Sequence, residues 1–478
     1  TIANITTSGS IIGIDARGDL NGVAQPIGTT ANKLGSSISR LGGSSVRNVL
    51  IEGNGTAGDQ SGVRVAAELV SPPTIPDSFV AGTEPSGGIE FSDTQIANTA
   101  GRSFQVGLVD SSTSTTNPTA LPGSGGTVNI DYYGSIKVDR QNNGGFDNLL
   151  VGIAGKTGGM INLTAGGTPI GASVQNELLD IGGEGIFILG NTNLTSQTIN
   201  NIGNLTIVNP QPPTGAAVGG TAIALLDDSS TTSITSVATS SQAFGITKST
   251  GDSTILIRGG SPTFSFFGTI NNATATTPTG NGPIISIGGK VDPSTGTATT
   301  MTGATITIGG PGIDPLRDSS DGVLLGSFPT ITPASGPIQN STITIDGLRL
   351  TGSGVQMNDV TGGTTTFSNL DINVATSTTT PAFIATDGGT ITVDGISSIT
   401  NPSTTQFVIQ TVGTNDLQTM EFNRVISGVP NTNIAVDFSA TTTGSFTISD
   451  EFTVGGAQGT EATNINNPGG VTIDVPVP

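Results

Sequence analysis

The chain has 478 residues, a formal net charge of −20 from 35 acidic and 15 basic residues, and neither Cys nor His. The lack of Cys and His excludes Cys/His zinc sites, thiol nucleophiles and a Ser-His-Asp triad. The acidic excess argues against nucleic acid as a partner, because phosphates need a basic surface. Since 33% of the residues are hydrophobic and Trp is absent, the β-branched Ile, Val and Thr predict an ordered all-β chain.

The beginning of the sequence carries no basic-then-apolar leader, and its first residue is Thr1. We therefore expect a processed chain from which a signal peptide has been removed. No stretch approaches the roughly 18 apolar residues of a membrane helix. A chain without Cys also suits export through an oxidising compartment. The predicted location is extracellular or at a cell surface.

Two short motifs overlap near the N-terminus. Arg17-Gly18-Asp19 matches the tripeptide that integrin-binding proteins present on loops, so it is a candidate receptor-binding site. Asp15, Asp19 and Asn21 have a spacing that resembles a calcium loop. Arg17 stands at a ligand position, however, and no Glu closes the loop. A surface turn is the preferred interpretation, and Ca²⁺ is the only cofactor that these residues suggest.

Two later segments differ from the rest of the chain. In Thr29–Leu41 the residues Leu34, Ile38 and Leu41 have helical spacing, which predicts a short helix that caps a stack of strands. The segment 70–88 is dense in Pro and Gly and is predicted to be a loop.

A short phrase recurs along the chain, in which apolar residues alternate with Thr, Ser or Asn and end at Gly or Asp-Gly. Period-two alternation predicts a strand with one buried face, and the Gly and Asp that follow suit tight corners. Successive phrases lie about 20 to 25 residues apart, as from Ile285 to Ile306 and from Ile343 to Phe367, a period typical of solenoids.

The predicted fold is a parallel β-helix (β-solenoid) of roughly 20 coils. Residues 1–125 would form the N-terminal cap and irregular first coils, and residues 126–478 the regular rod. Tandem β-sandwich domains and a trimeric viral fibre shaft are the alternatives. Alternate residues are assigned to the core and to the surface. The predicted core positions are Ile306, Ile345 and Val393, and the predicted outer positions are Thr307, Thr344 and Thr392.

Some of these phrases contain Thr-x-Thr, which resembles the flat threonine ladders of β-helical ice-binding proteins. The three pairs are Thr305/Thr307, Thr342/Thr344 and Thr390/Thr392. A ladder needs such a pair on nearly every coil, but the stretch of chain from each pair to the next is longer than one predicted coil. We therefore expect a broken ladder of ordinary solvent-facing threonines.

Polysaccharide-cleaving enzymes share the β-helix scaffold, so an enzyme is a further alternative. Inverting glycosidases need two carboxylates about 6.5–9.5 Å apart. The adjacent acidic pairs Asp227-Asp228 and Asp450-Glu451 lie in or beside strand phrases, and no basic residue lies within twenty positions of Asp227. Only two Tyr residues are available for stacking on sugars. We predict that the protein is not an enzyme.

The last phrase, Gly470–Val475, is strand-like and is followed by Pro476. An exposed strand edge is a template for pairing with another chain. We therefore predict that Val471, Ile473 and Val475 form an assembly contact between copies of the protein.

The Gly/Thr/Asn-rich phrases, such as Ser341–Gly347 (STITIDG) and Gly389–Gly395 (GTITVDG), resemble the secreted passenger regions of bacterial autotransporters and filamentous-haemagglutinin-type adhesins. The resemblance implies a β-helix, a surface location and a role in contact or assembly. The expected function is that of a structural or adhesive, self-assembling subunit of a surface fibre, coat or layer. The alternative is a stand-alone adhesin that binds a receptor or glycan.

Overall fold

A computed structural model describes the side chains of residues 221–227, 253–268, 270, 282–292, 294–310, 322–331, 334–374, 381–400 and 407–476. Elsewhere it describes only the backbone of the strands named below. The chain divides into two compact units. Unit 1 is Thr1–Gly251 with Gly260–Phe266, and unit 2 is Asp252–Gly259 with Phe267–Pro478.

Unit 1 consists, in its described residues, of strands that pair in parallel. One series runs β1-β3-β5-β7-β9-β12-β15, a second runs β7-β10-β13-β16, and a third runs β2-β4-β6-β8-β11-β14. The strands are β1 (Ile2–Ser8), β2 (Ile12–Asp19), β3 (Ser44–Glu52), β4 (Ser61–Leu69), β5 (Gly87–Ala97), β6 (Arg102–Asp110), β7 (Thr127–Asp139), β8 (Leu149–Ile153), β9 (Gly159–Ala165), β10 (Asn176–Leu179), β11 (Ile186–Leu189), β12 (Leu194–Asn200), β13 (Leu205–Val208), β14 (Ile223–Leu226), β15 (Thr231–Thr235), β16 (Gly245–Thr247) and β18 (Thr263–Phe267).

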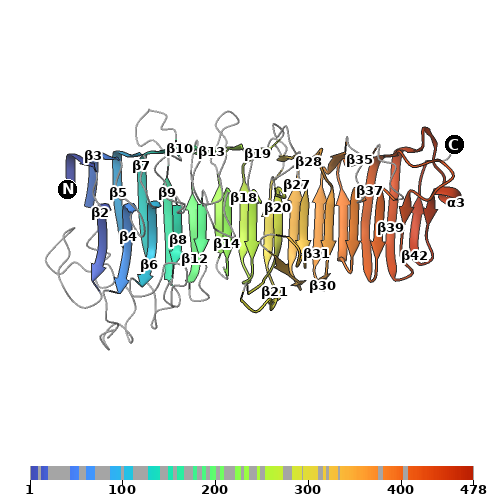
Figure 1. The fold of residues 1–478 in the computed structure, drawn as a ribbon, viewed down its shortest axis with the longest axis horizontal. Helices are drawn as coiled ribbons and strands as arrows, with labels where there is room; N and C mark the ends of the chain where they lie inside the picture. Colours follow the sequence, from blue (N-terminus) through green and yellow to red (C-terminus); the bar gives the residue numbers. More distant parts are fainter. Residues whose placement is uncertain are drawn as a thin grey trace. The chain divides into compact units, whose positions relative to one another are not determined.

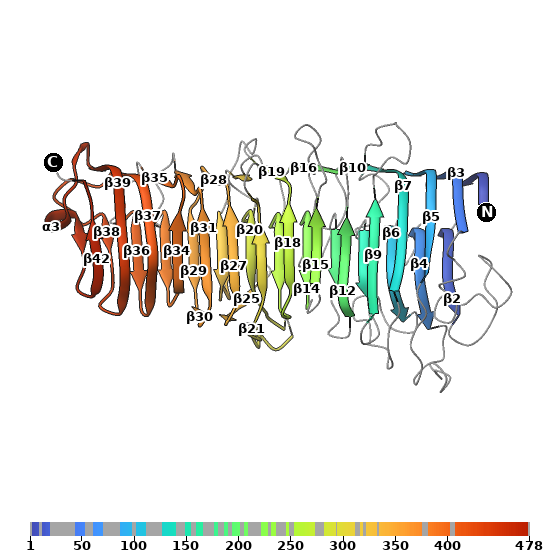
Figure 2. The same cartoon turned by 180° about the vertical axis from the view of Figure 1, so that it is seen from behind.

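Unit 2 contains three long rows of parallel strands, which lie side by side from yellow to red in Figure 1 and again in Figure 2. Row 1 is β22 (Thr305–Ile308), β27 (Thr342–Asp346), β31 (Thr364–Ser368), β34 (Gly389–Asp394), β37 (Asn415–Ser427), β39 (Thr442–Val454) and β42 (Gly470–Asp474). Row 2 is β17 (Ile255–Arg258), β20 (Ile285–Lys290), β24 (Val323–Gly326), β29 (Val355–Asn358), β33 (Phe383–Thr386), β36 (Ile409–Val412), β38 (Val436–Asp437) and β41 (Ile465–Asn466).

Row 3 is β19 (Thr269–Asn272), β23 (Leu316–Asp318), β28 (Leu348–Leu350), β32 (Asp371–Asn373) and β35 (Ser398–Asn401), which pairs with the end of β37. A short fourth row is β21 (Met301–Thr302), β26 (Ile338–Gln339) and β30 (Val360–Thr361). The remaining elements of unit 2 are β25 (Ser335–Gly336), β40 (Ala457–Gln458) and α3 (Glu461–Asn464).

The chain passes through these rows in a fixed order, and β29, β30, β31 and β32 form one complete passage before β33 returns to row 2. The described part is therefore all-β with long parallel sheets, an order compatible with a parallel β-helix. Parallel pairing is inconsistent with tandem β-sandwiches, which are antiparallel. The predicted cap at Thr29–Leu41 and most of the segment 70–88 lie outside the described residues. The boundary predicted near residue 126 stays a prediction.

The number of residues along the chain between paired positions of neighbouring strands varies more than the predicted period of 20 to 25 residues. Thr305 pairs with Thr342 and Thr342 pairs with Thr364, and the first of these steps spans a much longer stretch of chain than the second. The predicted repeat from Ile285 to Ile306 joins strands of two different rows, so these residues are not equivalent. The difference in chain length lies between the strands, and the strands themselves pair in register.

The interior of unit 2 confirms the predicted core. Ile306, Ile345 and Val393 are completely buried, while the three predicted outer threonines are half-buried. Aromatic rings also meet across the interior, as between Phe367 and Phe383, whose centroids lie 5.9 Å apart at 86°.

Asn and Asp occupy corners in both units because they tolerate positive φ. The corner residues with φ between 48° and 58° are Asp227, Asn340, Asp359, Asn369 and Asp387.

Row 2 departs from one-sided burial near its beginning. All residues of β17 and β24 are buried, as are the first five residues of β20. Strand β25 lies antiparallel to the end of β20, and a Cβ at Gly288 would meet the Ser335 side chain at 2.7 Å. Both faces of these strands are buried, so consecutive apolar residues replace the alternating pattern in β17 and β24.

Candidate functional site

A regular surface of unit 2 is formed by threonines on the outer face of row 1. Strands β22, β27, β31 and β34 are neighbours, and each carries Thr-x-Thr at equivalent positions. We call this array the threonine ladder. Its first column is Thr305, Thr342, Thr364 and Thr390, and its second column is Thr307, Thr344, Thr366 and Thr392.

The expectation of a broken ladder is therefore wrong. A fourth Thr-x-Thr pair, Thr364 and Thr366 of β31, lies between the pair on β27 and the pair on β34. This rung divides the long gap from Thr342 to Thr390 into two steps, each close to one predicted coil. A search that allowed loops of unequal length would find the ladder, because the signal Thr-x-Thr is present on all four strands.

The ladder is accessible and has defined borders. Thr305 and Thr342 are exposed, and the other six threonines are half-buried between their neighbours. On the next strand Asp416 pairs with Thr390, so the first column ends at a carboxylate. Beside the second column, Ser368 donates a hydrogen bond to Asp394 Oδ1 at 2.6 Å. Charged residues therefore stand around the ladder but not within it.

The last strand of row 1, β42, carries the predicted assembly residues Val471 and Ile473, and Val475 follows its end. Strand β42 pairs with β39, and no second strand partner of β42 exists among the described residues. Val471 is 6% exposed, whereas Ile473 and Val475 are only half-buried. On the preceding strand Phe446, the register partner of Ile473, is fully buried. The apolar interior is thus less covered at β42 than one strand earlier.

A buried cation stabilises row 2. Arg258 is 3% exposed, and its guanidinium donates to the carbonyl oxygens of Ile257 and Ser286 and to Ser286 Oγ at 2.7–3.1 Å. Burial lowers the pKa of Arg258 to about 9. Because β17 and β20 are neighbours, these bonds tie two successive strands together. We assign this residue a structural role.

The N-terminal candidates lie in a strand. Arg17, Gly18 and Asp19 are the last residues of β2, where they pair with β4, so their backbone does not form a protruding turn. Asp15 and Asp19 are separated along the same strand by about 13 Å at the rise of a β-strand. That extended backbone differs from the tight loop of a calcium site. Asn21 lies outside the described residues.

Three of the four residues in the acidic pairs considered for catalysis are described. Asp450 is exposed in β39, and Glu451 accepts a hydrogen bond from Thr453 Oγ1 at 3.0 Å. Asp227 has a positive φ, and Asp228 lies outside the described residues. Within the described residues no group of three His, Cys, Asp or Glu is placed to hold a metal ion.

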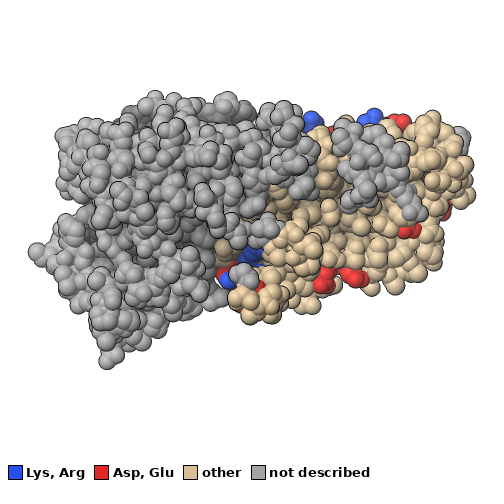
Figure 3. All heavy atoms as spheres, viewed as in Figure 1, with Lys and Arg blue, Asp and Glu red and all other residues tan. Residues whose placement is uncertain are grey.

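The face of unit 2 seen in Figure 3 carries its charged side chains mostly along the upper and lower margins, with a broad uncharged middle. Among the helices that the structure describes, none has the length and apolarity needed to cross a membrane.

The described residues form an almost entirely β fold with long parallel sheets, an apolar interior that includes Phe side chains, and threonine hydroxyls on the outer face of row 1. No protein-family model, curated protein or solved structure matches the chain.

Proposed function

We propose that this protein is a non-enzymatic structural subunit of an extracellular fibre, coat or surface layer, built as a β-solenoid whose copies associate through β42. Its acidic composition and lack of Cys support the extracellular location. The long parallel sheets of unit 2 support the solenoid, since stacked repeats bury a continuous core and leave their ends to be covered.

The observation that carries this proposal is the incomplete burial at β42. Strand β42 pairs with β39 on one side, and its half-buried Ile473 lies beside the fully buried Phe446, while the half-buried Val475 follows the end of the strand. A strand from a second copy that paired with β42 would satisfy backbone groups and cover these aliphatic side chains together. Both gains favour association at this edge.

Electrostatic repulsion opposes that association. Two copies with a net charge of −20 each repel one another at low ionic strength. Salt screens charges beyond about 10 Å at 0.1 M, so assemblies should grow as ionic strength rises. Divalent cations should act in the same direction by binding to surface carboxylates.

Light scattering of the purified full-length chain across ionic strength tests the proposal. The variant Ile473→Lys places a charge on the inward face of β42 and should abolish association. Thr472→Lys introduces the same charge at an exposed outer position of the same strand and should leave association intact. Circular dichroism checks that both variants remain folded. A chain that stays monomeric at every ionic strength would refute the proposal and favour a stand-alone adhesin.

A further inference from the structure

Two columns of side chains follow one corner of unit 2, where the chain passes from row 1 to row 3. The acidic column lies at the ends of the row 1 strands and consists of Asp346, Ser368, Asp394 and Glu421, the last of which follows the register partner of Val393. The arginine column lies on row 3 and its continuation, and it consists of Arg349, Asp371, Ser398, Arg424 and Glu451. We call the two columns together the corner strip.

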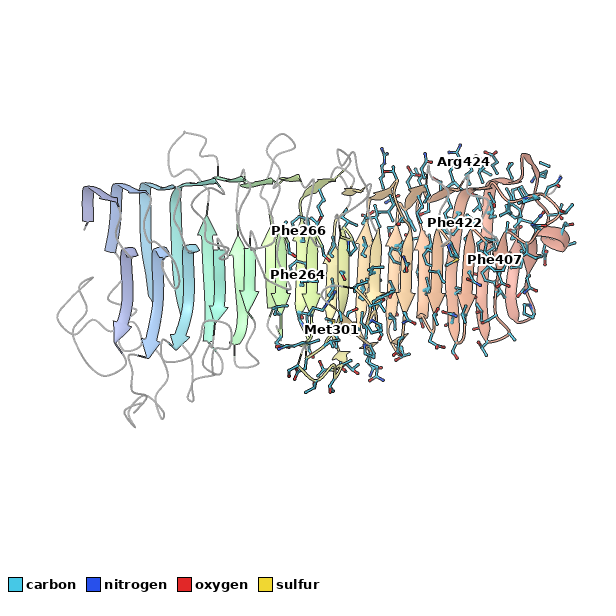
Figure 4. The ribbon with its side chains drawn as sticks, viewed as in Figure 1. Phe264, Phe266, Met301, Phe407, Phe422 and Arg424 are labelled. Atoms are coloured by element: carbon cyan, nitrogen blue, oxygen red, sulfur yellow. The ribbon has the colours of Figure 1, made fainter. Side chains whose placement is uncertain are left out.

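The two arginines of the corner strip are free to bind a carboxylate from outside. Arg349 and Arg424 are exposed, and neither forms an ion pair with another described residue. The carboxylate beside Arg349 in the column is bound elsewhere, because Asp371 accepts a hydrogen bond from Ser398 Oγ at 2.7 Å. In Figure 4 Arg424 lies at the upper margin, where Figure 3 shows basic and acidic side chains close together. A guanidinium binds a carboxylate through two parallel hydrogen bonds, which makes it a specific anchor.

Opposite charges stand at the same levels of the two columns. Arg349 comes three residues after Asp346, and Arg424 comes three residues after Glu421, so each pair belongs to one passage of the chain around the corner. At the two levels between them a serine stands across from an aspartate, in the pairs Ser368 with Asp371 and Asp394 with Ser398. None of these four levels therefore holds two residues of the same charge.

This pattern is complementary to itself. A two-fold axis parallel to the direction in which the strands follow one another brings the acidic column of each copy against the arginine column of the other, at the same level. Arg349 then faces Asp346 and Arg424 faces Glu421, and each pair forms twice. A two-fold axis perpendicular to that direction would instead place each column against itself, with acidic residues opposite acidic residues. The charges thus favour two copies that run in parallel.

An exposed apolar residue stands in the middle of the corner strip. Ile396 lies in sequence between Asp394 and Ser398, one from each column, and it is 78% exposed. Its backbone N–H donates to Asn369 Oδ1 at 3.1 Å, which fixes the turn that carries it. On the parallel two-fold axis Ile396 would contact Ile396 of the second copy, and both would leave water. We propose that the corner strip is an interface through which two copies of this protein pack side by side in parallel, with Ile396 at the axis.

The contact is small, which determines how it acts. Five strands and two columns cover about 20 Å by 10 Å, a few hundred Å², whereas a stable interface buries about 800 Å² on each partner. One such contact is weak, but many act together when copies are already held in line. The inference therefore rests for its role on the proposed assembly through β42, although the contact itself includes no residue of that strand. It would join neighbouring lines of copies into a sheet or bundle.

Disulfide capture tests the contact in the full-length chain, whose native sequence contains no Cys. With oxidised glutathione as the oxidant, Ile396→Cys should form a covalent dimer, because a disulfide needs two Cα atoms within about 7 Å. The matched control is Val412→Cys, at the other exposed large hydrophobic residue, and it should stay monomeric. Both variants also carry Ile473→Lys, so association through β42 does not contribute. Light scattering of Ile473→Lys alone tests that association separately.

Charge reversal in the Ile396→Cys protein tests the pairing of the columns. Arg349→Asp with Arg424→Asp should slow dimer formation by about tenfold or more, because four weak ion pairs become repulsive at once. Asp346→Lys with Glu421→Lys should have the same effect. A mixture of the two reversed proteins should form disulfides between them again, since the acidic columns of one then face the basic columns of the other. Misfolding would not be rescued by mixing.

Three results would overturn the proposal. One is a folded Ile396→Cys protein that forms no dimer, and another is a Val412→Cys protein that dimerises equally fast. The third is a rate of dimer formation that charge reversal leaves unchanged. The disulfide can form while association through β42 fails, and the reverse, so each proposal is judged by its own measurement.

Discussion

The hydroxyl groups of Thr411 and Thr442 lie 2.8 Å apart in the interior of unit 2, where neither side chain is more than 1% exposed. Thr411 belongs to β36 in row 2, and Thr442 begins β39 in row 1. Ser439 completes the cluster, because its hydroxyl lies 3.0 Å from that of Thr442 and its backbone N–H donates to Thr411 Oγ1. A buried polar contact thus joins two rows of strands.

Replacing either threonine by Val should destabilise the protein, because the remaining hydroxyl loses a buried partner. Each single variant, Thr411→Val or Thr442→Val, should cost about 1–3 kcal/mol in the free energy of unfolding. The double variant should cost less than the sum of the two, since both partners are then apolar. Urea unfolding of the four proteins measures this coupling, and strict additivity would show that the contact contributes nothing.

The alternation of inner and outer positions in β27 can be tested at two adjacent residues. Ile345→Asp places an unpaired charge in the interior and should cost several kcal/mol. Thr344→Asp lies on the outer face and should change stability by no more than about 1 kcal/mol. Thermal unfolding followed by circular dichroism compares them. The opposite order would mean that the faces of this strand are exchanged.

Arg258 should not tolerate replacement by Lys. The planar guanidinium reaches two carbonyl groups and the Ser286 hydroxyl at once, whereas a lysine ammonium is a compact charge that cannot copy this geometry. Arg258→Lys should lose about 1–3 kcal/mol at pH 7, as measured by urea unfolding. Stability equal to that of the wild type would show that the hydrogen bonds at this site are not needed.

The same variant should make stability depend on pH. Burial lowers the pKa of Arg258, and it should likewise hold the pKa of a lysine there below its usual value of about 10.4. Between the lowered and the usual pKa the unfolded chain binds more protons than the folded one, so stability rises with pH. Arg258→Lys should therefore recover stability between pH 7 and about pH 9 relative to the wild-type protein, because the pKa of Arg258 is about 9 and its guanidinium stays charged over most of this range. A parallel pH profile for the two proteins would contradict this.

Alanine substitutions at two glycines with positive φ distinguish the cost of backbone strain from the cost of steric overlap. A Cβ at Gly326, where φ is 101°, would overlap the backbone carbonyl of Asn358. At Gly303, where φ is 69°, a Cβ would meet nothing within 4 Å. Gly303→Ala should cost about 1–2 kcal/mol from the left-handed conformation alone. Gly326→Ala should cost clearly more, and equal melting temperatures for the two variants would exclude the overlap.

The sequence was sufficient to predict the inner and outer faces of individual strands. In β27 the alternation of Thr and Ile places Ile345 inside and Thr344 outside, as observed. In β17 the consecutive apolar residues Ile255, Leu256 and Ile257 are typical of a strand buried on both faces, and that signal was available in the sequence.

The neighbour of each strand was much harder to predict. Thr344 lies beside both Thr307 and Thr366, although the stretch of chain that leads to it from Thr307 is much longer than the stretch onward to Thr366. A bulge adds a further difficulty in β37, where the register shifts between Phe422 and Arg424. Phe422 is buried and Arg424 is exposed, and Figure 4 labels both. No local pattern shows where a bulge falls, because pairing with the adjacent strand determines it.

Residues that pair in neighbouring strands are separated by unequal lengths of chain, so insertions and deletions between strands are compatible with the fold. The register depends on backbone pairing between strands, so chain length between the rows is not constrained by the core. The turn from Asp292 to Thr297 illustrates this freedom: it is closed by its own hydrogen bonds, including Gly296 N to Asp292 O at 2.8 Å, and its described side chains are exposed. A foreign peptide grafted into this turn would be displayed next to β20 of row 2. Surface segments of the protein could therefore be exchanged one repeat at a time without a change in the register of the strands.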